Sequence, residues 1–171
     1  MSVTPTSFFI DTCIWLDYFF PTRKGYGDAT ALISFLYEHQ LSIYYSSGVL
    51  QNLSHIARAQ MRSELQALGE QNDTKAALVA QQFAWSCIEN SRKIATVVGS
   101  DESAVWLAEK FYEIHSDFED CLVMAAVKRS NSDYLVTNDK ALLRCGVVPA
   151  ISSHDAWRLV ASLYEPGDSE F

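Results

Sequence analysis

The sequence is poor in cysteine, proline and basic residues, and it has no long apolar run. Its four cysteines (Cys13, Cys87, Cys121 and Cys145) lie far apart without a CxxC pair, which argues against a disulfide scaffold or a zinc ribbon and favours a reducing compartment. No apolar run reaches the roughly 18 residues of a membrane span. The opening MSVTPTSFFIDTC does not resemble a secretory signal. We therefore expect a cytoplasmic protein with no membrane association.

The shortage of basic residues sets the charge. The 171 residues include 13 Lys+Arg against 21 Asp+Glu, a formal net charge of −8. This balance argues against a broad basic surface for nucleic acid and leaves room for a small local one. The length favours one domain with a substantial core, and the globular composition excludes wholesale disorder. We expect a domain over residues 1–164 and a flexible polar tail over 165–171.

Short apolar segments alternate with segments of helical spacing. The expected strands are Ser7–Asp11, Leu41–Tyr45, Tyr134–Thr137 and Val147–Ile151. The last is expected at a sheet edge, because Pro149 has no backbone N–H to donate. The expected helices, besides the aromatic-rich Trp15–Phe20, are Ala29–His39, Val49–Gly69, Thr74–Ser91, Asp101–Ile114, Asp117–Ser130 and Ser153–Leu163. This alternation predicts a single α/β domain with a mostly parallel sheet of about four to five strands flanked by helices.

Polar residues follow three of the expected strands. Asp11 ends the first strand, Ser46 follows the second, and Asp139 comes shortly after the third. The carboxyl ends of parallel strands form the ligand-binding edge of an open α/β sheet. These side chains are therefore expected to meet in one crevice.

A second acidic group opens the helix expected from Asp117. Ser116 and Glu119 fit a capping box, which makes Asp117 the first helical residue and Asp120 the fourth. Residues three apart share a helix face. Acids in a first turn also stabilise the helix dipole, and this simpler explanation suffices for Glu119. It is less satisfactory for Asp117 and Asp120 together, since other acids end neighbouring strands.

Clustered carboxylates have a chemical consequence. Two of them about 4 Å apart repel by about 4 kcal/mol at an effective dielectric constant of 20, so that a cluster requires raised pKa values or a bound cation. Oxygen ligands without histidine or cysteine favour Mg²⁺ or Mn²⁺. Such ions commonly serve phosphoryl chemistry by activating a water.

Three segments in this order, FFIDTCIWLDYF, SDFEDCLVMAAV and DYLVTNDKALL, resemble a PIN domain, the fold of VapC-type toxin ribonucleases. The resemblance extends from about Ser7 to about Trp157. It implies a metal-dependent ribonuclease that acts as the toxin of a toxin–antitoxin pair, with an RNA substrate, an antitoxin partner and a homodimeric state. We also expect a homodimer because the apolar content of Trp15–Phe20 and Tyr26 exceeds what one helix face can bury.

The resemblance also implies roles for the acids. Asp11, Asp120 and Asp139 match the metal-binding acids of the family, where the ion is Mg²⁺ or Mn²⁺. Asp117 lies one turn before Asp120, where it would complete the metal shell or orient the attacking water. All four acids are therefore candidate catalytic residues.

Four further residues are candidate substrate contacts. Thr12 and Thr137 match the small hydroxyl residues of the motifs. Asn52, six residues after Ser46, stands where the family usually has another acid. Arg23, beside Lys24 in the loop PTRKGYG, is a candidate phosphate contact, although a solvated loop is the simpler explanation.

Two other functions are compatible with the sequence. Because Asn52 adds no negative charge, the chain is alternatively a PIN-fold module that binds RNA or protein with weakened or lost nuclease activity. A receiver-like domain phosphorylated on Asp11 leaves the acids at 117, 120 and 139 unexplained. The four histidines show no metal-ligand spacing and are expected to be structural or at the surface. Cys13 is expected to be a buried filler rather than a nucleophile.

Overall fold

The computed structural model describes residues 4–164, so the flexible tail expected over 165–171 lies outside the described residues. A parallel sheet of five short strands forms its centre, in the order β3-β2-β1-β4-β5. The strands are β1 (Ser7–Ile10), β2 (Ser42–Ser46), β3 (Thr96–Val98), β4 (Tyr134–Val136) and β5 (Ala150–Ile151). The single α/β domain with a parallel sheet is confirmed.

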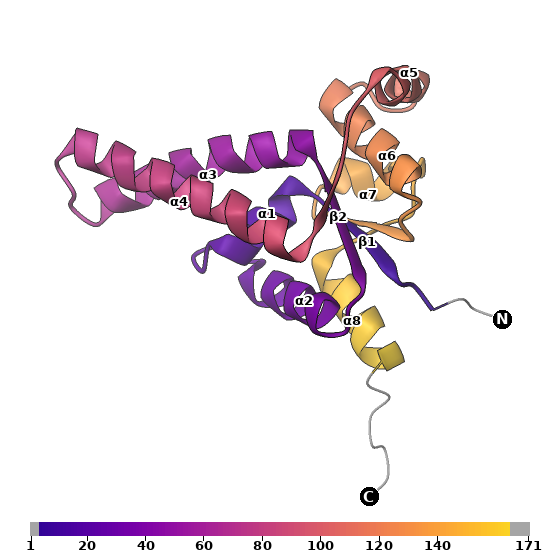
Figure 1. Ribbon diagram of the computed structural model, residues 1–171, viewed down its shortest axis with the longest axis horizontal. Coiled ribbons are helices and arrows are strands. Elements are labelled where there is room, and N and C mark those ends of the chain that lie inside the picture. Colours follow the sequence, from indigo (N-terminus) through magenta and orange to yellow (C-terminus); the bar gives the residue numbers. More distant parts are fainter. Residues whose placement is uncertain (1–3, 165–171) are drawn as a thin grey trace, which may run out of the picture.

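The helices connect these parallel strands and cover both faces of the sheet. They are α1 (Thr12–Phe19), α2 (Tyr26–Glu38), α3 (Ser47–Ala67), α4 (Asp73–Ile94), α5 (Glu102–Phe111), α6 (Phe118–Ser130), α7 (Lys140–Cys145) and α8 (Ser153–Tyr164). Figure 1 shows α1 to α4 on one side of the strands and α5 to α7 on the other. Helix α8 packs on α2, and α3 pairs along its length with α4 to form an arm that extends beyond the sheet.

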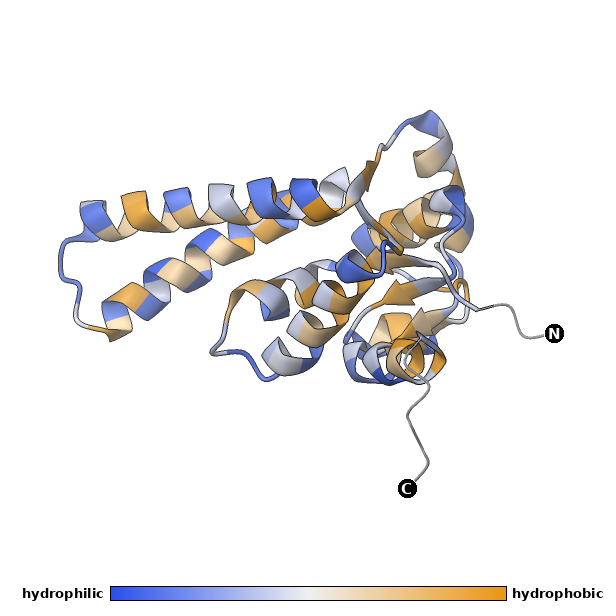
Figure 2. Ribbon diagram, turned by 60° about the horizontal axis from the view of Figure 1, so that its bottom comes forward, coloured by the Kyte–Doolittle hydropathy of each residue, from blue (hydrophilic) through white to orange (hydrophobic). Residues whose placement is uncertain are grey.

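The centre of the sheet is apolar, as parallel strands covered on both faces require. Phe8, Phe9 and Ile10 of β1 are fully buried, and so is Met124 of α6, the helix that packs across the sheet. Each such side chain contributes about 1.5–3 kcal/mol by leaving water. Figure 2 shows the strands and the facing helix surfaces as hydrophobic, whereas the α3–α4 arm is mixed. Within residues 4–164, no helix is long and apolar enough to cross a membrane.

Two elements were not expected from the sequence. Strand β3 lies at the edge beside β2, and Thr96 and Val97 are exposed there, so β3 lacks the apolar pattern of a buried strand. Helix α7 spans six residues, too few to show helical periodicity. The edge position predicted for the last strand is confirmed, but only Ala150 and Ile151 pair, since Pro149 precedes them.

The aromatic residues of α1 and the following Phe20 are partly or fully buried within the chain. Trp15 and Phe20 are 0% and 1% exposed, and Trp15 packs on Phe19 and Tyr45 with ring centroids 6.2 Å apart in each pair. Tyr18, Phe19 and Tyr26 are only partly buried and line a surface pocket, so the expected surplus of apolar surface around α1 stays a prediction. Large exposed apolar side chains also lie on other helices, for example Trp85 of α4.

Candidate active site

The strand order places a crevice at the carboxyl ends of β1 and β4. From β1 the chain adds β2 and then β3 on one side of the sheet, and it later adds β4 and β5 on the other side of β1. The order in which strands are added therefore switches sides between β1 and β4. Ligands of open α/β sheets bind at such a point. Asp11 directly follows β1, and its backbone N–H donates to the carbonyl of Val136, the last residue of β4.

Asp11 is held rigidly at the start of α1. Its Oδ1 accepts the Thr12 N–H at 2.7 Å, and its Oδ2 accepts the Thr137 hydroxyl at 2.7 Å. The residue is 9% exposed. Burial raises the pKa of Asp11; these hydrogen bonds partly offset the effect, and the charge of Asp120 adds to it. The fold therefore keeps a carboxylate where its charge is costly, which is common at functional sites.

Thr137 connects two of the acids. It is fully buried, and its Oγ1 donates to Asp11 while accepting the Asp139 N–H at 3.0 Å. Because the hydroxyl is used inside the protein, the interpretation of Thr137 as a substrate contact was wrong. The residue instead fixes the relative positions of Asp11 and Asp139. Asp139 in turn accepts the N–H groups of Ala141 and Leu142, and so caps α7.

The start of α6 differs by one residue from the expectation. Asp117, and not Ser116, is the N-cap, and its Oδ1 accepts the N–H groups of Glu119 and Asp120 at 2.9 and 3.2 Å. The predicted capping box was wrong because the carboxylate of Asp117 reaches these amides itself. Asp117 and Asp120 still line the same cavity.

That cavity, of about 340 Å³, collects the predicted acids. Its walls come from the β1–α1 junction, α3, the start of α6 and the loop after β4. The lining residues are Asp11, Thr12, Cys13, Leu16, Asn52, Ile56, Asp117, Glu119, Asp120, Val123 and Asp139. The structure thus brings together all four candidate catalytic acids, with Thr12 and Asn52. The assignment of Asn52 from Ser46 places it correctly at the cavity, because Ser46 ends β2 and caps α3.

Asp120 is affected by the charges of two other acids of the cavity. Burial raises its pKa, and the negative charges of Asp117 and Asp139 raise it further, while a hydrogen bond from His115 lowers it. Burial also raises the pKa of Glu119, with contributions from Asp117, Asp120 and Asp11. The carboxylates therefore repel one another, and a bound cation would relieve this repulsion.

The donor atoms fit a hard divalent ion that keeps part of its water. As placed in residues 4–164, no three acidic, histidine or cysteine side chains enclose a metal ion. Mg²⁺, however, commonly binds proteins through one or two carboxylates and several waters. The cavity wall offers carboxylates, the Asn52 amide and the Thr12 hydroxyl. An ion bound to Asp120 and a neighbouring acid, with water completing its shell, suits this all-oxygen set.

Cys13 lines the cavity without the properties of a nucleophile. Burial, with the charge of Asp11, raises the pKa of its thiol to about 12. Its Sγ lies 3.4 Å from Asp11 Oδ2 and accepts the Asn138 N–H at 3.3 Å. A protonated thiol is a poor nucleophile, so the structure favours the predicted filler role.

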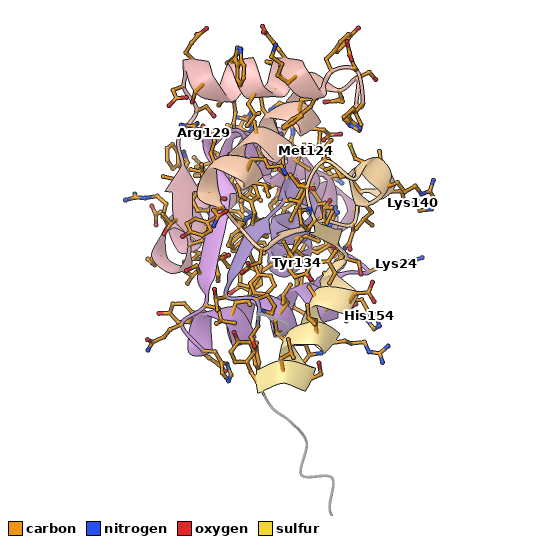
Figure 3. The ribbon with its side chains drawn as sticks, turned by 90° about the vertical axis from the view of Figure 1, so that its right-hand side faces the viewer. Lys24, Met124, Arg129, Tyr134, Lys140 and His154 are labelled. Atoms are coloured by element: carbon orange, nitrogen blue, oxygen red, sulfur yellow. The ribbon has the colours of Figure 1, made fainter. Side chains whose placement is uncertain are left out.

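Arg23 is not among the residues that line the cavity, and it has partners inside the protein. Its Nε donates to Asp17 Oδ1 at 2.6 Å, and the side chain of Asp17 is 8% exposed. Asp17 also accepts Asn138 Nδ2 at 3.2 Å, which ties the residue before Asp139 to this ion pair. The ion pair gives Arg23 a structural role, and its contact with a substrate phosphate stays a prediction. Lys24 points away from the molecule, as Figure 3 shows.

Replacing Arg23 is therefore expected to destabilise the protein. In Arg23→Ala the buried Asp17 carboxylate loses its counter-charge, which costs several kcal/mol for fully buried pairs. Because the Arg23 side chain is 32% exposed, we expect a smaller loss of about 1–2 kcal/mol. Urea denaturation would measure it, with Lys24→Ala as the exposed control. Equal stability of the two variants would contradict a structural role for the ion pair.

The comparisons with known proteins agree with this architecture. A family model described as "PIN domain" matches residues 7–141. No curated protein matches the chain. Among solved structures, the chain aligns with VapBC2 from Rickettsia felis, a structure that contains a DNA fragment from the VapBC2 promoter. The TM-score is 0.59 and the sequence identity 12%, and the alignment covers 85% of this chain and 97% of that chain.

Two further structures show the same fold. FitAB bound to the IR36 DNA fragment aligns with a TM-score of 0.57 at 14% identity, over 86% of this chain and 95% of that chain. Mycobacterium tuberculosis VapC20, described as a sarcin-ricin loop cleaving toxin, aligns at 0.54 with 16% identity, over 82% and 95% of the two chains. At these identities the likeness concerns the fold.

Proposed function

The chain belongs to the PIN domain family, and on that premise we propose that it is a metal-dependent endoribonuclease, the toxin of a toxin–antitoxin pair. The observation that carries the proposal is the cavity at the carboxyl ends of β1 and β4, where Asp11, Asp117, Asp120 and Asp139 gather. Burial raises the pKa of Asp11 and of Asp120. Such a costly group of negative charges suits a cation, and a bound cation would in turn attract a phosphodiester.

In this proposal Asp120 and a neighbouring acid, Asp11 or Asp139, would hold Mg²⁺ or Mn²⁺ directly, and the remaining acid would reach the ion through one of its waters. A bound ion of this kind lowers the pKa of a water and stabilises charge developing on the phosphate. The hydroxyl of Thr137 keeps Asp11 and Asp139 in register. Asp117 uses Oδ1 to cap α6, so its Oδ2 is the atom that would accept a proton from the attacking water.

An RNA substrate is proposed from the chemistry of the cavity and from one neighbour. The Thr12 hydroxyl and the Asn52 amide line the wall beside the acids and would contact the RNA backbone. VapC20 is described as cleaving the sarcin-ricin loop. The VapBC2 and FitAB structures support a protein antitoxin as partner. A homodimer and a cytoplasmic location stay part of the proposal, with the dimer formed through apolar side chains such as Trp85.

Asn52 favours a second candidate function. It places a neutral amide in the cavity where the family usually has an acid. With one negative charge fewer, hard-cation binding is weaker. The alternative is therefore a PIN-fold module that binds RNA or protein and cleaves slowly or not at all.

Cleavage of a labelled RNA mixture with Mn²⁺, with EDTA, and with Asp120→Asn distinguishes the two. We expect EDTA to abolish cleavage and Asp120→Asn to reduce it at least about 100-fold, since losing a metal ligand removes several kcal/mol of transition-state stabilisation. Glu89→Gln, an exposed acid of α4, is the matched control and should cleave normally. RNA that binds to the wild type without being cut would support the binding module instead.

A further inference from the structure

His115 is directed into the protein from an exposed segment. It lies between α5 and α6. All residues from 112 to 119 are exposed except His115 itself. The His115 side chain is 13% exposed, and its Nε2 lies 2.7 Å from Oδ2 of Asp120. The ring therefore has a specific polar partner, and that partner, Asp120, is one of the acids that line the cavity.

The backbone of His115 is fixed on both sides of the ring. Its N–H donates to the Phe111 carbonyl at 2.9 Å, and its carbonyl accepts the Cys121 thiol at 3.1 Å. These two bonds join the end of α5 to the first turn of α6. They fix the backbone from which the largely buried imidazole reaches Asp120, where Nε2 is the donor to the carboxylate.

The contact determines which oxygen of Asp120 faces the cavity. The Asp120 side chain is 30% exposed and lies close enough to Asp117 and Asp139 for their negative charges to disfavour its own. The hydrogen bond engages Oδ2 and leaves Oδ1 for a ligand. Hydrogen-bond partners of metal-binding carboxylates orient them in this way, and their removal typically costs 10–100-fold in metal affinity.

We propose that His115 is a positioning residue that holds Asp120 ready to bind the metal ion. The inference rests on the proposed function, because it assumes that Asp120 is a metal ligand. It assigns no bond between His115 and the metal. The prediction is that a side chain able to donate one hydrogen bond at the same reach can replace histidine.

Mn²⁺ titration followed by electron paramagnetic resonance of the unbound ion tests this prediction without any assay of activity. His115→Leu removes the donor, and His115→Asn is too short to reach Asp120, so both should weaken Mn²⁺ binding about 10–100-fold. His115→Gln should stay within about threefold of the wild type. His154→Leu is the control, since His154 pairs with Asp28 outside the cavity. Urea denaturation without metal identifies any variant that has lost its fold.

The outcomes separate the two proposals. If the wild type and a folded His115→Leu or His115→Asn bind Mn²⁺ equally, the positioning role is overturned while the metal site stands. Equal weakening in His115→Gln and His115→Leu also overturns it, because the ring itself would then be required. A wild type that binds no Mn²⁺ overturns the proposed metal site together with the role of His115. If His115→Leu or His115→Asn fails to fold, Mn²⁺ binding by the other variant tests the positioning role.

Discussion

Asp11→Asn is expected to lose at least about 100-fold of its Mn²⁺-dependent RNA cleavage and, at the same time, to unfold at a higher temperature than the wild type. The loss follows from the proposed function, in which the charged Asp11 holds the metal ion directly or through one of its waters. The gain follows from the burial of Asp11 and the charge of Asp120 beside it. Asparagine keeps an oxygen for the Thr12 N–H and removes the charge, and its NH₂ group donates to the Thr137 hydroxyl, which donates to Oδ2 in the wild type.

The sign of the stability change follows from the raised pKa of Asp11. A group whose pKa is higher in the folded than in the unfolded state favours folding at low pH, and that contribution is lost as pH rises above about 4. At neutral pH the wild type therefore carries a penalty that Asp11→Asn lacks. We expect a melting temperature higher by about 2–4 °C at pH 7, corresponding to about 1 kcal/mol. The difference should shrink near pH 4.

Asp133 provides a control of opposite sign. Burial raises its pKa, but bonds from the N–H groups of Thr6 and Ser7 and from the Ser7 hydroxyl outweigh this, and the net pKa is lowered. Asp133→Asn should therefore melt below the wild type at neutral pH. Calorimetry of both variants compares the two cases. If Asp11→Asn also melts below the wild type, Asp11 is a structural acid, and the tension between stability and function expected of an active site is absent.

The part of the site that the sequence predicts depends on strand ends. Asp11 and Asp139 follow apolar segments whose strands are parallel, and parallel strands bring their carboxyl ends to one edge. The α6 acids follow from helix spacing even though the cap is Asp117. Helical periodicity and the alternation of strands and helices are local patterns that determine where a residue lies in the fold. The sequence alone therefore places these acids at the site.

The remaining parts depend on contacts that no local pattern encodes. His115 meets Asp120 across the turn into α6, where backbone direction is set by the packing of α5 on α6. Arg23 turns inward because Asp17 is buried beneath its loop. Strand β3 forms by pairing with β2 although its side chains are exposed. In each case tertiary structure selects the partner, and the residue type alone permits several.

Asn52→Asp is expected to tighten Mn²⁺ binding about thirtyfold. Asn52 lines the cavity beside the acids, and a carboxylate there would add a negative charge near the ion. One such charge about 4 Å from a divalent cation contributes about 2 kcal/mol even with the screening of water. Titration calorimetry with Mn²⁺ on the wild type and the variant measures the change.

The same substitution tests how the natural chain differs from the usual family pattern. Asn90→Asp, in a separate cavity at the end of α4, adds the same charge and should leave Mn²⁺ affinity within about twofold, since a distant surface charge is screened. If Asn52→Asp also accelerates RNA cleavage, metal binding limits the wild type, and asparagine has moderated an active nuclease. Tighter binding without faster cleavage would favour the binding module. Unchanged or weaker binding in a folded Asn52→Asp would show that Asn52 faces the cavity without reaching the ion, because an added carboxylate then brings only repulsion from the neighbouring acids.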